Sequence, residues 1–389
     1  MDQAVVDGLR CVRCGEIGPL RYDTWGCAAC RELGVPSALL ANLDLAGVAG
    51  AALWSTWQGR RPSVWSHAEL LPVRAEDAVT LGEGGTPLLA LPESVAGPNV
   101  LVKDERRNPT GSFKDRFFSV ATSWAAASGA DAVAVASSGN AGVSAAAYAA
   151  AAGLDCHMIV TAGVGRTWLG QAELHGARIL RARDADERWR ILRERADEWA
   201  VLSNASPVPV SSLWVGIEGY KTLAHEIVRD LGAAPAAVLV PVSRGDAFAG
   251  MWAGFQELHQ LGVVSGLPRM VAAERHPSLT RALAAGAELP PAVPDEDSPA
   301  TSIKSPRATV MTLRAIRESG GTAVLCGDEQ LVAARRRLAR AGLAAEVSSA
   351  AGLVALDELR ARGEIGPDEQ VVQLLTAHAA NQPETLPEP

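Results

Sequence analysis

Lysine is scarce in this sequence, which argues against its use as a general surface charge. The chain has 36 basic residues, of which the lysines are Lys103, Lys114, Lys221 and Lys304 and the rest are arginines. Arginine can replace a lysine that only supplies positive charge. It cannot replace an amine that must lose its proton and attack a carbonyl group, because guanidinium stays charged. Each remaining lysine is therefore a candidate for chemistry.

Other absences limit the class of protein. The formal net charge of −8 and the lack of a long basic run argue against a nucleic-acid partner. The first residues lack the positive segment and apolar core of a signal peptide, so we expect a cytoplasmic location. The apolar stretch over residues 35–54 contains Pro36 and Asp44. We predict that it forms a helix packed on the domain and does not span a membrane.

Four of the six cysteines are closely grouped, as Cys11, Cys14, Cys27 and Cys30, with the spacing C-x2-C-x12-C-x2-C. In a cytosolic protein this spacing indicates a metal site, and four thiolates leave no position open for water. We therefore predict a structural Zn²⁺ in a zinc-ribbon-like unit over residues 1–34. The alternative is a ribbon that no longer loads metal.

The rest of the chain has the pattern of an α/β protein. At 389 residues and 48% hydrophobic content, it is long enough for two or three packed units. From about residue 80, short apolar runs alternate with helical segments, which predicts parallel sheets. The predicted strands cover residues 100–103, 132–136, 156–160, 177–180, 236–242, 270–273 and 370–375. The predicted helices cover residues 112–127, 141–152, 168–175, 185–199, 219–231, 247–261, 328–341 and 348–362. Five prolines predict a long loop over residues 286–308.

Lys114 has the most favourable setting of the lysines. It lies in the segment Asn108-Pro109-Thr110-Gly111-Ser112-Phe113-Lys114-Asp115-Arg116, a turn of small and constrained residues at the start of a predicted helix. A second turn, Ser137-Ser138-Gly139-Asn140, joins a predicted strand to a predicted helix. Backbone N–H groups at such a helix start bind anions such as a substrate carboxylate.

These segments belong to an ordered set of motifs. The others are Gly82-Glu83-Gly84-Gly85-Thr86-Pro87-Leu88, Glu218-Gly219 with Lys221-Thr222, Glu346 with Ser348-Ser349-Ala350, and Leu375-Thr376. On these motifs, the chain from about residue 80 to residue 378 resembles threonine synthases and related pyridoxal-phosphate enzymes of the tryptophan synthase β type. Some members carry a similar four-cysteine ribbon.

The resemblance implies the α/β fold of fold-type II pyridoxal-phosphate enzymes. Two parallel-sheet domains are expected within residues 35–389, with the site between them. The smaller one would cover about residues 115–215 and the larger one the remainder. A homodimer is the expectation for the family.

The resemblance also implies roles for individual residues. Lys114 would form the Schiff base with the aldehyde of pyridoxal phosphate and then move protons. Asn140 would bond the ring hydroxyl of the cofactor, and Thr376 its pyridine nitrogen. The substrate, an amino acid, would bind at Ser137, Ser138 and Gly139. The loop expected to hold the cofactor phosphate aligns with Ser243, Arg244, Gly245, Asp246 and Ala247.

The sequence departs from the family in these regions. In the phosphate loop only Gly245 keeps the expected glycine, so we expect Arg244 to bind phosphate directly and Asp246 to cap the next helix. Ser212-Leu213-Trp214-Val215 stands where an Asn-Pro-x-Arg-like stretch is usual, and Gln171 stands where lysine is usual. Residues 376–380 have alanines where glycines are usual. Each lost charge-assisted bond is worth about 1.5–3 kcal/mol, and Arg166 is the candidate to replace the missing charge.

Three functions follow from these observations. The first is a threonine-synthase-type lyase that eliminates phosphate from O-phosphohomoserine and adds water to give threonine. The second is β-replacement or β-elimination on another activated amino acid, such as O-phosphoserine, with the same cofactor. The third is a degenerate, non-catalytic paralogue that binds a metabolite or a partner.

Overall fold

The computed structural model describes residues 6–137 and 139–385. The chain divides into two units. Unit 1 contains Met1–Gly85 and Asn108–Thr222, and unit 2 contains Thr86–Arg107 and Leu223–Pro389. Among the described residues, no helix is both long enough and apolar enough to cross a membrane.

Unit 1 begins with a small three-stranded sheet in the order β2-β1-β3, with antiparallel pairing. Its elements are β1 (Val6–Cys11), β2 (Ile17–Gly18), α1 (Ala28–Glu32) and β3 (Leu39–Leu43). The sheet therefore takes its third strand from beyond residue 34. The prediction of one helix over residues 35–54 is wrong, because β3 pairs with β1 and only the later residues form a helix, α2 (Gly50–Gln58). Gly47 separates the two with a φ of 81°, which is not a helical value.

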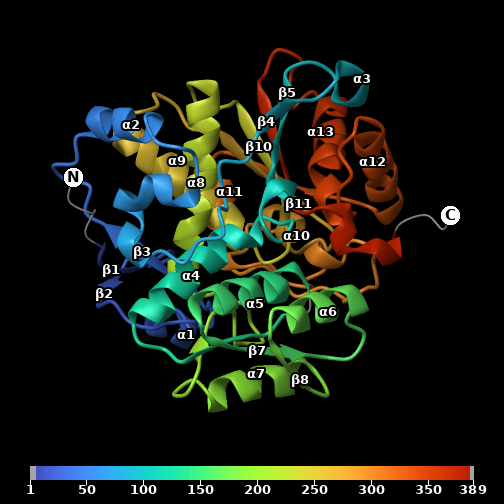
Figure 1. Ribbon diagram of the computed structural model, residues 1–389. Coiled ribbons are helices and arrows are strands. Elements are labelled where there is room, and N and C mark those ends of the chain that lie inside the picture. The colour runs from blue at the N-terminus through green and yellow to red at the C-terminus, as the bar shows by residue number, and fades with distance from the viewer. Residues whose placement is uncertain (1–5, 138, 386–389) are drawn as a thin grey trace. The chain divides into compact units, whose positions relative to one another are not determined.

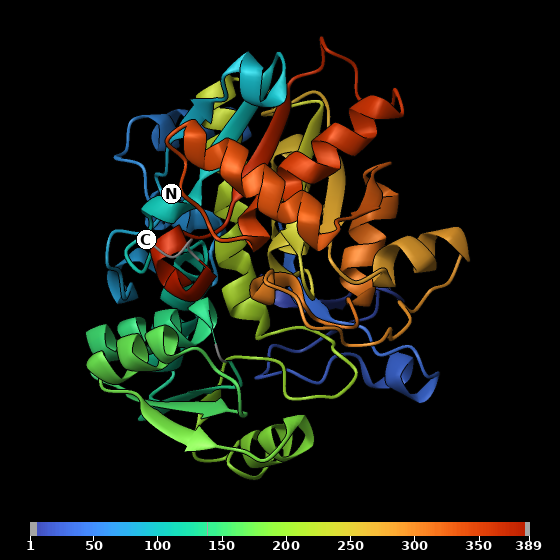
Figure 2. The same ribbon diagram turned by 90° about the vertical axis from the view of Figure 1, so that its right-hand side faces the viewer.

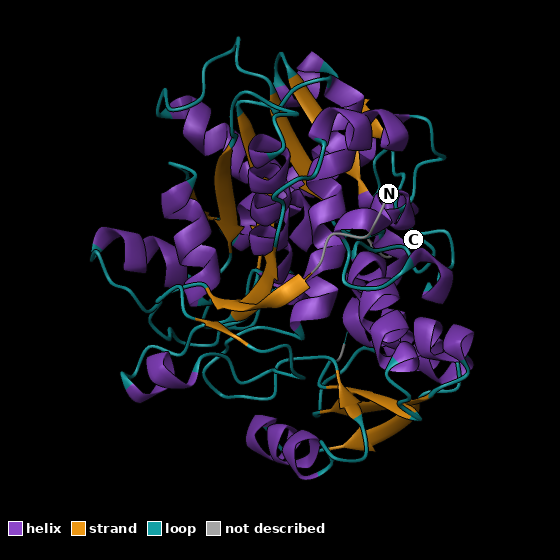
Figure 3. Cartoon of the chain, turned by 90° about the vertical axis from the view of Figure 1, so that its left-hand side faces the viewer, coloured by secondary structure: helices purple, strands orange, loops and turns teal. Residues whose placement is uncertain are grey.

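The second sheet of unit 1 has four parallel strands in the order β8-β7-β6-β9. The strands are β6 (Ala132–Val135), β7 (Asp155–Val160), β8 (Arg178–Arg181) and β9 (Ala200–Val201). The helices α5 (Asn140–Ala152) and α6 (Arg166–Leu174) lie on one side of this sheet, and α7 (Ala185–Glu194) lies on the other (Figures 1 and 3). This is the predicted strand–helix alternation, with α7 ending earlier than expected. The 3₁₀ helices η1 (Val64–Leu70) and η2 (Ala75–Asp77) precede it.

Helix α4 (Lys114–Ala127) and the first part of helix α8 (Trp214–Leu231) belong to unit 1, which ends within α8 at Thr222. The two helices pack with almost no space between them at two glycines of α8. A β-carbon on Gly219 would lie 2.1 Å from the Arg116 carbonyl oxygen, and one on Gly216 would lie 2.5 Å from the Phe117 ring. Any larger residue at either position would have to displace the Arg116 backbone or the Phe117 ring. Helix α8 begins at Trp214 and not at the predicted Gly219. Glycines discourage helix formation in isolation, but here two of them permit the close packing of α8 on α4.

Unit 2 is built around a six-stranded sheet in the order β12-β11-β10-β13-β5-β4. All neighbouring pairs are parallel except β4 with β5. The strands are β4 (Leu88–Ala90), β5 (Val100–Asp104), β10 (Ala237–Val242), β11 (Arg269–Glu274), β12 (Thr322–Leu325) and β13 (Val371–Leu375).

Helices cover both faces of this sheet. The α-helices are α3 (Glu93–Ala96), α9 (Asp246–Gln260), α10 (Ser278–Ala284), α11 (Val310–Glu318), α12 (Asp328–Arg340) and α13 (Ala351–Ala361). The 3₁₀ helices are η3 (Glu105–Arg107), η4 (Thr301–Ile303), η5 (Ser348–Ala350), η6 (Ala379–Asn381) and η7 (Pro383–Thr385). Helices α12 and α13 lie on one side of the strands, and α9 and α11 lie on the other (Figures 1 and 2). The predicted loop over residues 286–308 contains only η4.

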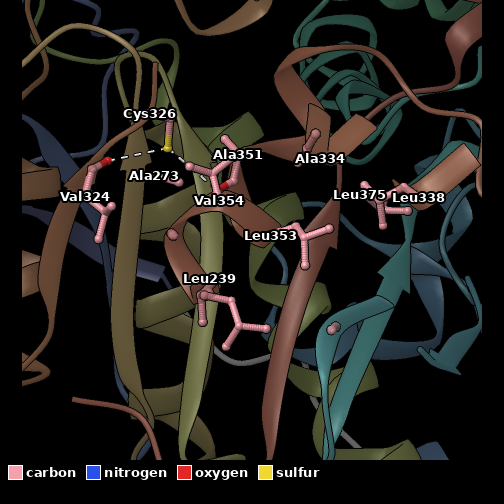
Figure 4. Close-up of a cluster of buried hydrophobic side chains, with 14 of the residues drawn as sticks. Leu239, Ala273, Val324, Cys326, Ala334, Leu338, Ala351, Leu353, Val354 and Leu375 are labelled. Atoms are coloured by element: carbon pink, nitrogen blue, oxygen red, sulfur yellow. Dashed lines mark hydrogen bonds between the residues drawn. The ribbon is translucent and has the colours of Figure 1, made fainter. Parts of the chain in front are cut away.

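The core of unit 2 lies between the sheet and helices α12 and α13. Figure 4 shows buried side chains from the strands, such as Leu239 and Leu375, together with Leu338 of α12 and Leu353 of α13, and all four are fully buried. Cys326 is also buried there, with its Sγ 3.7 Å from the carbonyl oxygens of Val324 and Ala351. These near-continuous apolar strands are typical of a parallel sheet covered on both faces.

The α4–α8 packing gives a stability prediction. We expect Gly219→Ala to lower the free energy of unfolding by about 1–3 kcal/mol, because the added methyl group must push the backbone of α4 away. Gly170→Ala in α6 is the matched control, since nothing lies within 4 Å of its β-carbon position. Replacing this helical glycine with alanine should raise the free energy of unfolding by about 0.5–1 kcal/mol. Urea unfolding of both variants checks the prediction, which is wrong if Gly219→Ala is as stable as the wild type.

Candidate active site

The Lys114 turn is held by hydrogen bonds within unit 1. Gly111 has a φ of 74°, which favours glycine, and its N–H donates to the Asn108 carbonyl at 2.8 Å. The Asn108 side chain accepts from the Gly84 N–H at 3.0 Å. Helix α4 starts at Lys114, whose N–H donates to the Ser112 hydroxyl at 3.4 Å. The lysine is thus presented at the first position of a helix by a braced turn.

The motif around Glu83 braces the same region. This carboxylate is fully buried and accepts hydrogen bonds from several donors of unit 1. They are the Trp65 Nε1, Ser119 Oγ, Tyr148 hydroxyl, Thr80 Oγ1 and Leu81 N–H groups. A buried carboxylate needs such donors to offset its loss of water. Because Ser119 and Tyr148 come from α4 and α5, Glu83 ties its loop to both helices.

Asp115, the neighbour of Lys114, closes the turn. Its carboxylate accepts from the Thr110 N–H at 2.7 Å, the Thr110 hydroxyl at 2.6 Å and the Ser144 hydroxyl at 2.6 Å. Burial, together with the smaller effect of the Glu83 charge, raises the pKa of Asp115 to about 6 against the lowering effect of these hydrogen bonds. Asp115 therefore links the Lys114 turn to α5.

The Lys114 amine lies beside two neighbouring aromatic side chains. Its Nζ is 3.4 Å from the Tyr220 hydroxyl and 4.4 Å from the centre of the Phe113 ring. The centres of the Phe113 and Tyr220 rings are 5.5 Å apart, and Tyr220 is 1% exposed. Lys114 itself is partly exposed. Its amine is therefore accessible and lies against this aromatic pair.

The other lysines have different surroundings. Lys103 is fully buried, and its Nζ lies 2.8 Å from Glu226 and 2.6 Å from the Thr86 carbonyl oxygen. Lys221 is 1% exposed and lies 2.5 Å from Glu218. Lys304 is exposed. Lys103 and Lys221 are thus in buried ion pairs, which leaves Lys114 as the lysine best placed for chemistry.

The second predicted turn lies at the carboxyl end of β6, as expected. Ser137 and Gly139 are half-buried, Gly139 is the N-cap residue of α5, and Asn140 is the first helical residue, at 5% exposure. Ser138, also predicted to bind substrate, lies outside the described residues. The start of α5 offers N–H groups without helical partners, which can bind an anion.

Helix α6 carries the predicted cation. Arg166 is the first residue of α6, is exposed, and makes no hydrogen bond or ion pair with any residue that the structure describes. Trp168 of the same helix is 5% exposed, and its ring lies 3.9 Å from the position of a β-carbon on Gly139. The sequence reasoning missed Trp168, because only folding brings α6 beside the Gly139 turn.

The predicted phosphate loop in unit 2 joins β10 to α9. Gly245 has a φ of 102°, and a β-carbon there would lie 1.8 Å from the Thr312 hydroxyl, so glycine is required. The Arg244 carbonyl accepts from the Thr309 and Thr312 hydroxyls at 2.9 and 2.8 Å. These bonds pack the loop against the start of α11, where Thr312 leaves no room for a side chain at residue 245. Thr312 lies far away in the sequence, and sequence reasoning missed it.

The Arg244 side chain is suited to an anion. Burial lowers the pKa of its guanidinium, and within the described chain this group makes no hydrogen bond and no ion pair. A half-buried, unpaired guanidinium at a glycine cradle fits the phosphate of pyridoxal phosphate. The expectation that Asp246 caps α9 is wrong, because Gly245 occupies the N-cap position and Asp246 is the first helical residue. A carboxylate in the first turn still interacts favourably with the helix dipole.

Thr376 directly follows β13, as predicted. It is 4% exposed, and its hydroxyl lies 2.8 Å from the Ser349 hydroxyl. Ser349 also accepts from the Ala377 N–H at 3.0 Å. Two residues of the predicted motifs thus form one hydroxyl pair at the carboxyl end of the sheet, where sites of parallel sheets are found.

The four cysteines of unit 1 form a group that fits a tetrahedral metal. Their Sγ atoms all lie within 4.8 Å of one another, with Cys11 and Cys30 at 3.6 Å and Cys14 and Cys27 at 3.8 Å. A Zn–S distance of about 2.3 Å requires sulfur atoms about 3.8 Å apart at a tetrahedral site. Burial raises the pKa of the Cys11 thiol to about 12, so metal binding must displace its proton.

Trp214, one of the departures noted above, has a structural role. It is 2% exposed, and its indole Nε1 donates to the Arg21 carbonyl at 2.9 Å. Its ring packs edge-on against the Trp124 ring of α4. The centre of the Trp124 ring is in turn 5.3 Å from that of the Tyr22 ring. The apolar segment around Trp214 therefore anchors the cysteine-containing region to α4 and α8.

Comparisons with known proteins identify the family of this chain. The family model of pyridoxal-phosphate dependent enzymes matches residues 79–377. The threonine synthase of Methanosarcina acetivorans is 37% identical over 339 residues, which cover 84% of this chain and 82% of that protein. The threonine synthase of Mycobacterium bovis is 35% identical over 326 residues, covering 82% and 88%. That of Halalkalibacterium halodurans is 34% identical over 340 residues, covering 85% and 92%.

Solved structures share the fold at lower identity. Diaminopropionate ammonia lyase from Escherichia coli has a TM-score of 0.67 at 18% identity, covering 79% of this chain and 87% of that chain. Maize serine racemase has a TM-score of 0.64 at 18% identity, covering 76% and 88%. At these identities the likeness shows the fold alone, and it confirms the predicted α/β class.

Proposed function

The chain belongs to the family of pyridoxal-phosphate-dependent enzymes, and we propose that it acts as a threonine synthase. The reaction eliminates phosphate from Cγ of O-phosphohomoserine and adds water at Cβ, giving threonine and inorganic phosphate. The observation that carries the proposal is the Lys114 amine, presented at a helix start beside two aromatic rings. Identity of 34–37% to several threonine synthases over most of the chain supports this choice of substrate.

Lys114 would do the proton chemistry. Its amine would hold the aldehyde of the cofactor and then, when released, remove the proton from Cα of the substrate. Pyridoxal phosphate, when bound, supplies an electron sink for the carbanion that this proton loss creates. The Phe113 ring, 4.4 Å from Nζ, limits the water around the amine.

The residues predicted from the motifs would hold the cofactor. In unit 2, the Arg244 guanidinium and the backbone of Ser243, Gly245 and Ala247 would bind the phosphate, and Thr376 would bond the pyridine nitrogen. In unit 1, Asn140 would bond the ring hydroxyl. A hydroxyl at the pyridine nitrogen leaves that nitrogen unprotonated. That condition favours elimination and replacement over transamination.

The substrate would bind to unit 1 by its two anionic ends. Ser137 and Gly139, at the start of α5, would receive the carboxylate, and Ser138 stays a prediction outside the described residues. Arg166 would receive the phosphate. The apolar segment around Trp214 no longer argues for a different substrate, because Trp214 is used to anchor the Arg21 segment.

A structural Zn²⁺ at Cys11, Cys14, Cys27 and Cys30 completes the proposal. Four thiolates leave no open position on the metal, so it would take no part in the reaction. Its role would be to hold the strands and turns that carry Arg21 and Tyr22, which contact Trp214 and Trp124.

The reaction is tested by incubating the protein, loaded with pyridoxal phosphate, with O-phosphohomoserine and measuring phosphate and threonine. We expect Lys114→Ala to lose both the visible absorbance band of the bound cofactor and phosphate release. Lys304→Ala, which changes an exposed lysine, should keep both. Wild-type protein that holds the cofactor but releases no phosphate would rule out this substrate.

The role of Arg166 gives a second test. We expect Arg166→Ala to raise KM for O-phosphohomoserine by about 10- to 100-fold, which corresponds to one charge-assisted hydrogen bond of about 1.5–3 kcal/mol. Arg183→Ala removes another exposed arginine, one that pairs with Glu187, and should leave KM unchanged. Equal KM values for the wild type and Arg166→Ala would place the phosphate elsewhere.

Metal content tests the cysteine site. We expect about one zinc ion per purified chain, and much less in Cys27→Ser, because three thiolates bind zinc more weakly than four. Cys156→Ser is the matched control, since Cys156 is a buried cysteine outside the group. Elemental analysis of the three proteins gives the answer. If Cys27→Ser keeps its full zinc content, the cysteines do not form the site.

A further inference from the structure

Tyr220 lies beside the Lys114 amine but is not among the residues that the proposed reaction uses. Its hydroxyl is 3.4 Å from Nζ, and its side chain is 1% exposed. Its ring packs against Phe113 at 5.5 Å and Phe117 at 5.9 Å, both from the segment that carries Lys114. A buried phenol hydroxyl requires a polar partner, and here one partner is the amine on which the proposed reaction depends.

The packing of α8 on α4 brings Tyr220 to the segment that carries Lys114. Gly219, its neighbour, allows α8 to approach within contact of the Arg116 carbonyl oxygen, where a β-carbon would lie 2.1 Å away. Gly216, one turn earlier, gives the same close approach at the Phe117 ring. These two contacts fix the register of α8 on α4. The Tyr220 ring then packs against the Phe113 and Phe117 rings, which hold its hydroxyl near Lys114.

The chemistry of the pair follows from the donors and acceptors. A phenol hydroxyl can donate to the lone pair of a neutral amine and can accept from an ammonium group. The bond to the charged form is the stronger of the two. The hydroxyl therefore gives the amine a fixed direction in either state and favours its charged state. The Phe113 ring, whose centre is 4.4 Å from Nζ, lies against the amine next to Tyr220.

We propose that Tyr220 is a positioning residue for Lys114. The Tyr220 hydroxyl holds the Lys114 amine in the direction from which it attacks the aldehyde carbon of the cofactor. This inference rests on the proposed role of Lys114 in holding the cofactor aldehyde. The competing explanation is that Tyr220 only fills space between α4 and α8, in which case its ring would matter and its hydroxyl would not.

The test compares Tyr220→Phe with the wild type, since phenylalanine keeps the ring and removes only the hydroxyl. Cofactor-free protein is mixed with pyridoxal phosphate at a series of pH values, and the growth of the visible band gives the rate of capture. The midpoint of the rate against pH reports the protonation of the Lys114 amine. Tyr22→Phe is the matched control, because it also removes a tyrosine hydroxyl that is hydrogen-bonded within unit 1, to the Val201 carbonyl at 2.7 Å.

For Tyr220→Phe we expect two changes. The pH midpoint should fall by about half to one unit, because the charged amine loses its stronger bond. Above the midpoint, where the amine is neutral in both proteins, capture should be about 2- to 10-fold slower, because its direction is no longer fixed. Tyr22→Phe should match the wild type in both respects. A purely space-filling Tyr220 would leave both values unchanged, and that result would overturn the proposal.

The outcomes separate this inference from the function on which it rests. If the wild type captures no cofactor, both are overturned. If the wild type captures it and Tyr220→Phe behaves identically, only the role of Tyr220 is overturned. Should Tyr220→Phe fail to fold, the wild type labelled with 3-fluorotyrosine replaces it, because fluorine makes the hydroxyl more acidic with little change in ring size. The midpoint should then also fall, and an unchanged midpoint would count against the proposal.

Discussion

The close contact between α4 and α8 is the constraint on which the rest of unit 1 depends. Gly216 and Gly219 remove the side chains that would separate the helices. Their contact fixes Tyr220 against Lys114 near one end of α4, while Trp214 reaches Trp124 near the other end. The Trp214 indole also holds the Arg21 carbonyl. The cysteine-containing region and the candidate catalytic lysine are therefore attached to the same pair of helices.

The surroundings of the lysines refine the argument from their scarcity. Lys103 and Lys221 are retained in buried ion pairs with Glu226 and Glu218. Scarcity alone therefore does not identify a reactive lysine. What distinguishes Lys114 is that it combines partial exposure, a braced turn and aromatic neighbours. A buried ion pair and an accessible amine are thus two separate settings in which this chain keeps lysine.

Much of the fold could be predicted, because strand and helix periods in the second half of the sequence are local properties. The errors arose where distant residues decide the structure. Strand β3 forms because β1 is available to pair with it, and α8 extends to Trp214 because α4 accepts its glycines. The turns of the candidate site were found from small residues and glycines. Sequence reasoning missed Tyr220, Trp168 and Thr312, since each of them contacts a site residue that is distant in the sequence and comes near only on folding.

The departures from the family pattern have different physical meanings. Trp214 replaces a polar stretch, yet its indole is used to hold the Arg21 segment, so this change concerns packing within unit 1. Arg244 stands in the loop of unit 2 where glycine cradles are expected, and its carbonyl is held by Thr309 and Thr312 while its guanidinium stays unpaired within the described chain. We propose that phosphate binding here passes to a different group, the Arg244 guanidinium. The two departures thus differ in kind, because one alters packing inside unit 1 and the other changes which group is offered to an anion.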